Sequence, residues 1–234
     1  MSPPVVLTWA GTRRGMRACV PLLIGLTPFG LVCGIVSHGA GLSLAESTLM
    51  SGLVYSGSAQ LVALNTWGHP APILAAAVAT LAVNSRLALM GPVLAPWFDR
   101  LRGWRLWLSL FGMADQNWAL CVADMNAGGR DAGLLFGSGL AMWTMWLVTT
   151  IAGFEIGHLV QPPPGHPIFF AGLAVFVSML AGQWRGAGDF LPWLVAAGVA
   201  VAVSQLLPGA PWFIVAGSLA GSLVGGVRDM RRRG

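Results

Sequence analysis

The sequence predicts an all-α integral membrane protein, a polytopic helical bundle of six to eight hydrophobic segments that include broken or re-entrant helices. Three observations carry this prediction: 56% of the 234 residues are hydrophobic, only 9% are charged, and the mean hydropathy is +0.72. A soluble domain has roughly a quarter of its residues charged, so that class is excluded. Because one span takes about 20 residues, eight spans leave only short loops, and we expect residues 1–234 to form a single transmembrane domain.

The apolar segments follow one another at 19–37, 44–64, 71–95, 106–125, 133–153, 168–184, 190–207 and 212–227. Several are short or contain Pro and Gly. Membranes tolerate an interrupted helix only where protein covers the freed backbone groups or where they line a cavity. We therefore expect some of these segments to be broken or re-entrant.

The charges indicate orientation more than partners. All thirteen basic residues are arginines, and the net charge is +5. Arginines beside apolar segments are explained by topology and anionic lipid, so nucleic acid is not expected as a partner. The basic ends, 1–18 and 228–234, predict two cytoplasmic termini and an even number of crossings. Eight crossings would place Arg100, Arg102 and Arg105 outside, six could place them inside, and the sequence leaves both open.

The first segment contains a candidate helix break at Pro28 and Gly30. Pro28 removes one helical hydrogen bond, and Gly30 with Gly34 forms a GxxxG face for close helix packing. One interpretation is a structural kink. The other is a broken helix whose free backbone donors hold a carboxylate, which makes Pro28 and Gly30 candidate substrate-binding residues.

The second segment contains an island of small and amide residues, with the only tyrosine in the chain. Tyr55, Gly57, Ser58 and Gln60 fall within six residues. Such residues can bridge neighbouring helices at about 0.6 kcal/mol per hydrogen bond. Their density favours a substrate or ion surface over simple packing.

The third segment places Asn84 and Arg86 near its middle. An arginine at that depth costs at least about 2.5 kcal/mol and needs a carboxylate, backbone carbonyls or water. A permanent ion pair with Asp115 or Asp124 and an anion site for a substrate carboxylate both satisfy this need, and both interpretations stay open.

Asp115 in the fourth segment is the candidate for proton coupling. The pKa of a buried aspartate rises with desolvation and falls beside an arginine, so its protonation can depend on conformation. Asp124 lies nearer the segment end, where we expect it to face the interface or cap a turn.

The last segment repeats glycine every four residues, at Gly217, Gly221 and Gly225, which predicts a helix-packing face for this chain or for a partner subunit. The three cysteines have no metal-ligand spacing, and we expect neither metal nor cofactor. HExxH, GxSxG and P-loop patterns are absent. Gly186–Asp189 matches GxGD, but the second aspartate pattern of intramembrane proteases is missing, so we do not expect an enzyme.

Several stretches over residues 19–125 resemble the AzlC-type large subunit of bacterial branched-chain amino acid exporters, the AzlC/YgaZ family of permeases. The matching stretches, in the family's order, are Pro28-Phe-Gly30 with Gly34; Ala40-Gly-Leu-Ser43 through Glu46 into Met50-Ser; Tyr55-Ser-Gly-Ser-Ala-Gln60; Val83-Asn84-Ser-Arg86; and the segment around Asp115. The Tyr55 to Gln60 stretch followed by Asn84 and Arg86 is the most specific of them.

The resemblance implies a multi-pass permease of the cell inner membrane that exports branched-chain or similar apolar amino acids. It further implies coupling to the proton gradient and a small AzlD-type membrane subunit as partner. One departure is Gln116, where the family usually has an acidic residue. An exporter of another small organic acid or amine, and a non-transporting membrane subunit, remain the alternatives.

Overall fold

The computed structural model describes residues 5–65, 67–68, 73–159, 177, 181, 184, 186–207 and 212–233. This part of the chain is almost entirely helical, contains no β-strand, and has one isolated bridge between Val6 and Asp131. The prediction of an all-α membrane protein is confirmed. The α-helices are α1 (Trp9–Ala18), α2 (Val20–Gly39), α3 (Leu44–Val54), α4 (Gly57–Asn65), α5 (Ile73–Met90), α6 (Ala95–Phe98), α7 (Trp104–Phe111), α8 (Asp115–Asn126), α9 (Gly133–Leu159), α11 (Phe190–Leu206) and α12 (Trp212–Arg233), with a 3-10 turn η1 (Gly91–Leu94) before α6.

Hydropathy located most of these helices. The helices α2, α9, α11 and α12 coincide with four predicted segments, whereas the segment 168–184 lies largely outside the described residues. Among the described helices, α2 and α9 are long and apolar enough to cross a membrane.

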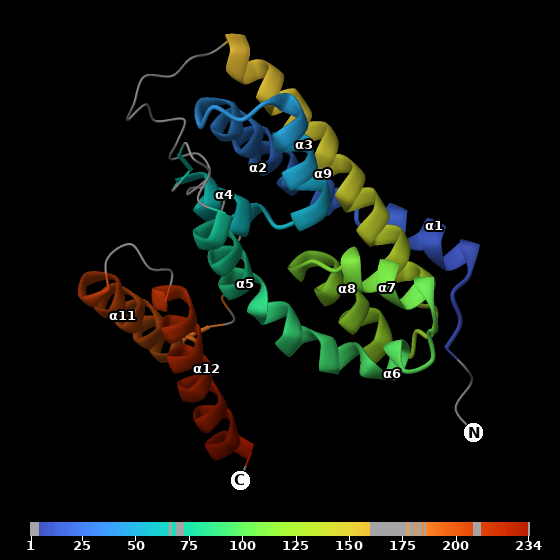
Figure 1. The fold of residues 1–234 in the computed structure, drawn as a ribbon. Coiled ribbons are helices and arrows are strands. Elements are labelled where there is room, and N and C mark those ends of the chain that lie inside the picture. The colour runs from blue at the N-terminus through green and yellow to red at the C-terminus, as the bar shows by residue number, and fades with distance from the viewer. Residues whose placement is uncertain are drawn as a thin grey trace.

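The two candidate spans α2 and α9 pack side by side and run in the same direction (Figure 1). Gly30 lies against Thr149, and Gly34 lies against the backbone of Thr150 and Phe154. At both glycines a Cβ atom would collide with α9, so the absence of a side chain is what allows this approach. The same parallel contact continues through α1, where Gly15 lies against the backbone of the first turns of α9.

The helix break expected at Pro28 and Gly30 is wrong, because α2 continues through both residues. Pro28 faces outward, while the neighbouring residues Phe29 and Gly30 are buried. The packing of that inner face against α9 holds the helix together across the hydrogen bond that proline removes. The structure therefore has one continuous helix with Pro28 inside it.

Breaks occur instead in two other predicted segments. The segment 44–64 divides into α3 and α4 at Tyr55 and Ser56, and the segment 106–125 divides into α7 and α8 at residues 112–114. In Figure 1 each of these helix pairs forms a bent hairpin beside the α2–α9 pair.

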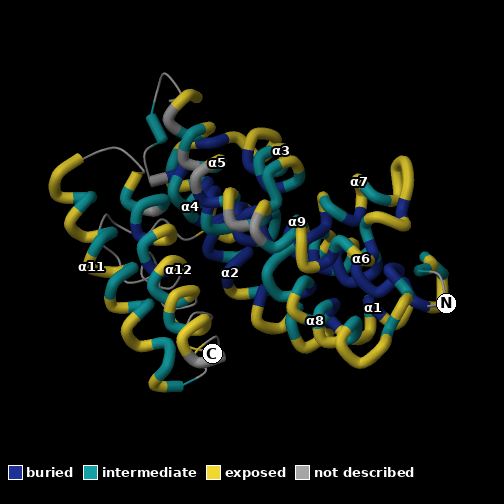
Figure 2. The backbone as a smooth tube through the Cα atoms, turned by 90° about the horizontal axis from the view of Figure 1, so that it is seen from below, coloured by how far each residue is buried: buried dark blue, intermediate teal, exposed yellow. Residues whose placement is uncertain are grey.

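The helices α11 and α12 pack against each other as a third hairpin, which lies to one side of the other helices (Figure 1). Gly217 and Gly221 lie against Ala196 and Ala200 of α11, and Gly225 makes ordinary contact with Pro192. The glycine face of α12 therefore packs within this chain. Figure 2 shows that buried residues concentrate along α2 and α9, whereas α11 and α12 are half-buried or exposed for most of their length.

Candidate functional site

The central break lies at Tyr55, between α3 and α4. A capping box starts α3: the Ser43 hydroxyl accepts from the Glu46 N–H at 3.2 Å, and the Glu46 carboxylate accepts from the Ser43 N–H at 2.7 Å. Tyr55 ends the helix in the left-handed conformation, with φ at 45°, the only non-glycine residue with positive φ in the described chain. A bulky residue seldom adopts this conformation, which costs of order 1–3 kcal/mol and concentrates at functional sites.

Gln60 holds the two sides of this break together. Its side chain is 1% exposed, and its Nε2 donates to the Ser51 hydroxyl of α3 at 2.8 Å. Its Oε1 accepts from the Trp146 indole N–H of α9 at 3.1 Å. This amide therefore links α3, α4 and α9 through hydrogen bonds buried in an apolar environment.

Gly57, the first residue of α4, lies between two aromatic rings. A Cβ atom there would collide with the rings of Phe29 and Trp146, whose centroids are 5.5 Å apart. Phe29 and Trp146 lie near the middle of α2 and α9 respectively. The break therefore reaches the mid-length of both candidate spans.

A pocket of about 520 Å³ lies between α3, α4 and α5. Its polar lining comes from Gln60, Thr80 and Asn84. The other lining residues are apolar: Met50, Val54, Ala63, Trp67, Ile73, Ala76, Ala77 and Leu81. A pocket of this size, with apolar walls and a few convergent polar groups, is typical of a small-molecule site.

Buried polar atoms near this pocket lack hydrogen-bond partners. In the described part of the chain they include the Tyr55 hydroxyl, the Ser56 hydroxyl and Asn84 Oδ1, with Ser47 and Thr150 further away in the sequence. Leaving such a group unpaired costs about 1–3 kcal/mol. Unpaired groups at a strained break beside a pocket are the groups that a polar ligand could satisfy.

The remaining predicted residues of this region are placed as follows. Ser58 lies half-buried in the first turn of α4, whereas Pro28 and Gly30 lie on α2, outside the pocket lining. Arg86 belongs to α5, one residue beyond Ser85 and two beyond Asn84, and its side chain lies outside the described part.

The second break, between α7 and α8, is held by Asn117. Its side chain is fully buried, donates from Nδ2 to the Gly112 carbonyl at 2.7 Å, and accepts from the Ala114 N–H at 2.7 Å. Asp115 is the first residue of α8 and is half-buried at this turn. The Phe111 ring centroid lies 6.2 Å from that of Tyr55, so the break between α7 and α8 approaches the break between α3 and α4.

Asp124 has a different partner from the one considered in the sequence. It pairs with Arg14 of α1 at 3.0 Å, with both guanidinium nitrogens donating to its two carboxylate oxygens. Among the described residues, no three His, Cys, Asp or Glu side chains come together as metal ligands.

Sequence reasoning missed Thr80, Trp146 and Asn117. Thr80 occurs one helical turn before Asn84, and that spacing was the available signal for a shared face. Trp146 is one of eleven tryptophans, and nothing in the sequence around it marks it as part of a site. Its hydrogen bond to Gln60 joins residues 86 positions apart, and no local pattern reveals such a pairing.

Comparison with known proteins gives consistent matches. The family model described as AzlC protein matches residues 21–160. The inner membrane protein YgaZ of Escherichia coli (strain K12) is 26% identical, over 95% of this chain and 94% of that protein. The branched-chain amino acid transport protein AzlC of Bacillus subtilis (strain 168) is 27% identical, over 91% of this chain and 83% of that protein. No solved structure matches.

Proposed function

The chain belongs to the AzlC protein family, and we propose that it is an inner-membrane permease that exports branched-chain amino acids. The name of the Bacillus subtilis relative supports the substrate class, and the name of the Escherichia coli relative supports the membrane. The export direction follows the resemblance described above. Transport, not catalysis, is the activity to test.

The observation that carries the proposal is the pocket between α3, α4 and α5. It combines apolar walls, including Met50, Val54 and Ala76, with the amides of Gln60 and Asn84. A branched aliphatic side chain needs such walls, because its transfer from water is favourable by about 0.8 kcal/mol per buried methylene. The polar groups of the amino acid need the hydrogen-bonding partners that the same pocket supplies.

The two charged groups of an amino acid have separate candidate partners. The first turn of α4, beginning at Gly57, suits the carboxylate because a helix N-terminus favours negative charge. Asn84 Oδ1, buried and unpaired, suits the ammonium group as an acceptor. We propose that Arg86 supplies the carboxylate with a cation on the same helix as Asn84.

Coupling to protons is assigned to Asp115. It lies half-buried at the turn between α7 and α8, close in sequence to Phe111, which approaches Tyr55. Gln116 cannot carry a proton, so coupling through this turn depends on Asp115 alone. The resemblance also supports a small AzlD-type membrane subunit as the partner of this chain.

The experiment measures amino acid efflux from cells loaded with a leucine-containing dipeptide, with the partner subunit co-expressed. We expect Asn84→Ala and Arg86→Ala to lower leucine efflux at unchanged protein level, and Asp115→Asn to abolish export against a gradient. Gln205→Ala, on the exposed face of α11, is the matched control. Wild-type efflux from Arg86→Ala would remove the anion-site role, and full uphill export from Asp115→Asn would remove the proton role.

A substrate panel in the same cells tests the substrate class. Valine, leucine and isoleucine should compete with one another, while small organic acids and amines without an apolar side chain should not. Competition by those acids or amines alone would replace the branched-chain assignment.

A further inference from the structure

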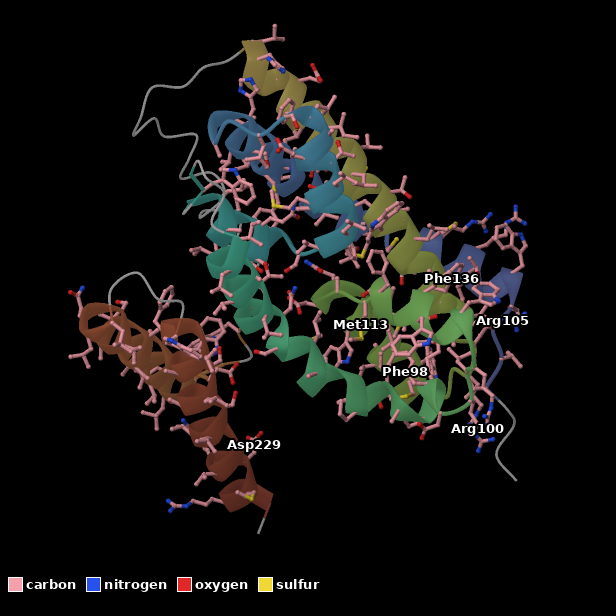
Figure 3. All side chains as sticks on the ribbon, viewed as in Figure 1. Phe98, Arg100, Arg105, Met113, Phe136 and Asp229 are labelled. Carbon is pink, nitrogen blue, oxygen red and sulfur yellow. The ribbon has the colours of Figure 1, made fainter. Side chains whose placement is uncertain are left out.

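The two ends of the α2–α9 pair carry different sets of charged residues. One end carries α1 with Arg13, Arg14 and Arg17, and Arg14 ties it to the last turn of α8 through Asp124. The same end holds Arg130, because the Val6 N–H just before α1 donates to its carbonyl at 3.0 Å. Figure 3 places Arg100 and Arg105 at this end as well. We call it the basic end.

The opposite end, where α2 and α9 finish, carries acidic residues and histidines. His38 and His158 are in contact there, with 3.2 Å between Nε2 and Nδ1. Glu155 lies one turn before His158, and Glu46 lies in the first turn of α3, a few residues beyond the end of α2. We call it the acidic end.

The hairpin α3–α4 enters from the acidic end and turns back. It begins beside the end of α2, where the Leu42 N–H donates to the Ser37 carbonyl at 3.2 Å. It reaches the middle of α9, where Gly57 lies against Trp146. Beyond the break, Gln60 bonds Ser51, so α4 folds back alongside α3 instead of continuing toward the basic end.

The hairpin α7–α8 enters from the basic end. Its tip packs at Gly112 against Gly139 of α9, and its return helix ends at the Arg14–Asp124 pair. The connection from α5 to α7 also lies at the basic end, because Leu94 and Trp97 pack in the same cluster as Leu134 at the start of α9. In addition, the Trp118 indole of α8 donates to the Met90 carbonyl at the end of α5, at 2.9 Å.

We infer that α3–α4 and α7–α8 are re-entrant hairpins that enter the bilayer from opposite faces, and that Tyr55 and Phe111, where their tips approach, form the barrier between the pocket and the basic face. By the positive-inside rule the basic end is cytoplasmic. This arrangement puts Arg100, Arg102, Arg105 and Arg130 all inside, which a full crossing by either hairpin would prevent. The pocket then lies on the outer side of the barrier.

This arrangement bears on the number of crossings in the described part of the chain. There α2, α5, α9, α11 and α12 would each cross the membrane, whereas the predicted segment 168–184 lies largely outside the described residues. The even number of crossings and the two cytoplasmic termini stay predictions from the sequence. The two segments that do not cross are those that the structure divides into half-helices.

The test of the topology is labelling of single cysteines with a membrane-impermeant maleimide, in a stably produced background without the three native cysteines. Ala45→Cys and Gly68→Cys flank α3–α4, and Arg102→Cys and Ala127→Cys flank α7–α8. We expect the first pair to be labelled only from outside and the second pair only from the cytoplasm. Gly39→Cys and Asn126→Cys are alternative positions if a variant is poorly produced. Labelling of either pair from opposite faces overturns the inference.

The barrier has its own test. The role of the barrier in transport rests on the proposed function, whereas the labelling measurement does not. Ala77→Cys, in the pocket lining, should be labelled only from outside. Adding Phe111→Ala should make it reachable from the cytoplasm, whereas adding Leu108→Ala, an exposed residue one turn earlier on α7, should not. Unchanged one-sided labelling with Phe111→Ala contradicts the barrier. Neither labelling experiment needs transport, so a failed efflux assay leaves the result interpretable.

Discussion

The indole N–H of Trp146 donates a hydrogen bond of 3.1 Å to the side-chain oxygen of Gln60, and both side chains are almost completely buried. This bond joins the middle of α9 to the half-helix that follows the break at Tyr55. It positions one wall of the pocket relative to the long α2–α9 pair. We therefore expect both the stability of the protein and its transport activity to depend on this bond.

Replacing Gln60 should destabilise the protein and reduce transport together. Gln60→Leu leaves the Trp146 N–H and the Ser51 hydroxyl unpaired, so we expect the free energy of unfolding to fall by about 2 kcal/mol. Thermal unfolding in detergent measures this loss. The double variant Gln60→Leu with Trp146→Phe should recover part of it, because no buried indole donor is then left. Additive losses would mean that the two side chains are not coupled.

Tyr55→Phe should separate stability from transport. The Tyr55 hydroxyl is buried without a partner, so its removal should leave stability unchanged or raise it. If the hydroxyl contacts the substrate, leucine efflux should nevertheless fall. Efflux at the wild-type rate from Tyr55→Phe would remove the hydroxyl from the binding site.

Tyr55→Val tests the backbone at the same position. Valine is β-branched and resists positive φ, so we expect a loss of about 1 kcal/mol or more relative to Tyr55→Asn, which tolerates it. The melting temperatures of the two purified variants give the comparison. Equal stability would argue against strain at the break.

Two glycines of α2 should respond oppositely to the same substitution. A Cβ atom at Gly34 meets the backbone of α9, so Gly34→Ala should cost about 1–3 kcal/mol through overpacking. Gly25 has nothing within 4 Å of that position, so Gly25→Ala should be neutral or stabilising by up to about 1 kcal/mol. Melting temperatures in detergent provide the measurement. A similar loss in both variants would point to a general intolerance of α2.

Enlarging a pocket residue should change which substrates are exported. Ala76 lines the pocket, and Ala76→Leu should lower efflux of leucine relative to alanine by on the order of tenfold, because added methyl groups compete with the substrate side chain. Ala88→Leu, on an exposed part of α5, is the control. An unchanged leucine to alanine ratio would place the side-chain site elsewhere.

Sequence reasoning predicted the long helices well, because a run of apolar residues needs a helix in a membrane whatever its neighbours. It chose the wrong break. Pro28 is a strong local signal, but packing of the opposite face of α2 outweighs it. Tyr55 carries no local preference for the left-handed conformation, so its break could not be located, although the small and amide residues around it drew attention to this stretch.

The candidate site, too, was predicted only in part. Gln60 and Asn84 were selected because amides are unusual in apolar segments, and the structure brings both into one pocket. The partners Trp146 and Thr80 were not selected, because tryptophan and threonine are common in such segments and only the tertiary contact distinguishes them. Asp124 was considered for Arg86, yet it pairs with Arg14, which is distant in sequence and adjacent only in the fold.

The parallel packing of α2 on α9 has a consequence for how the protein is made. Gly34 and Thr150 lie in contact but are more than one hundred residues apart in the chain. At translation rates of roughly 5–20 residues per second, α9 is synthesised on the order of ten seconds after α2. During that interval the glycine face of α2 must contact lipid or the insertion machinery. The contact between α2 and α9 therefore forms well after α2 has entered the membrane.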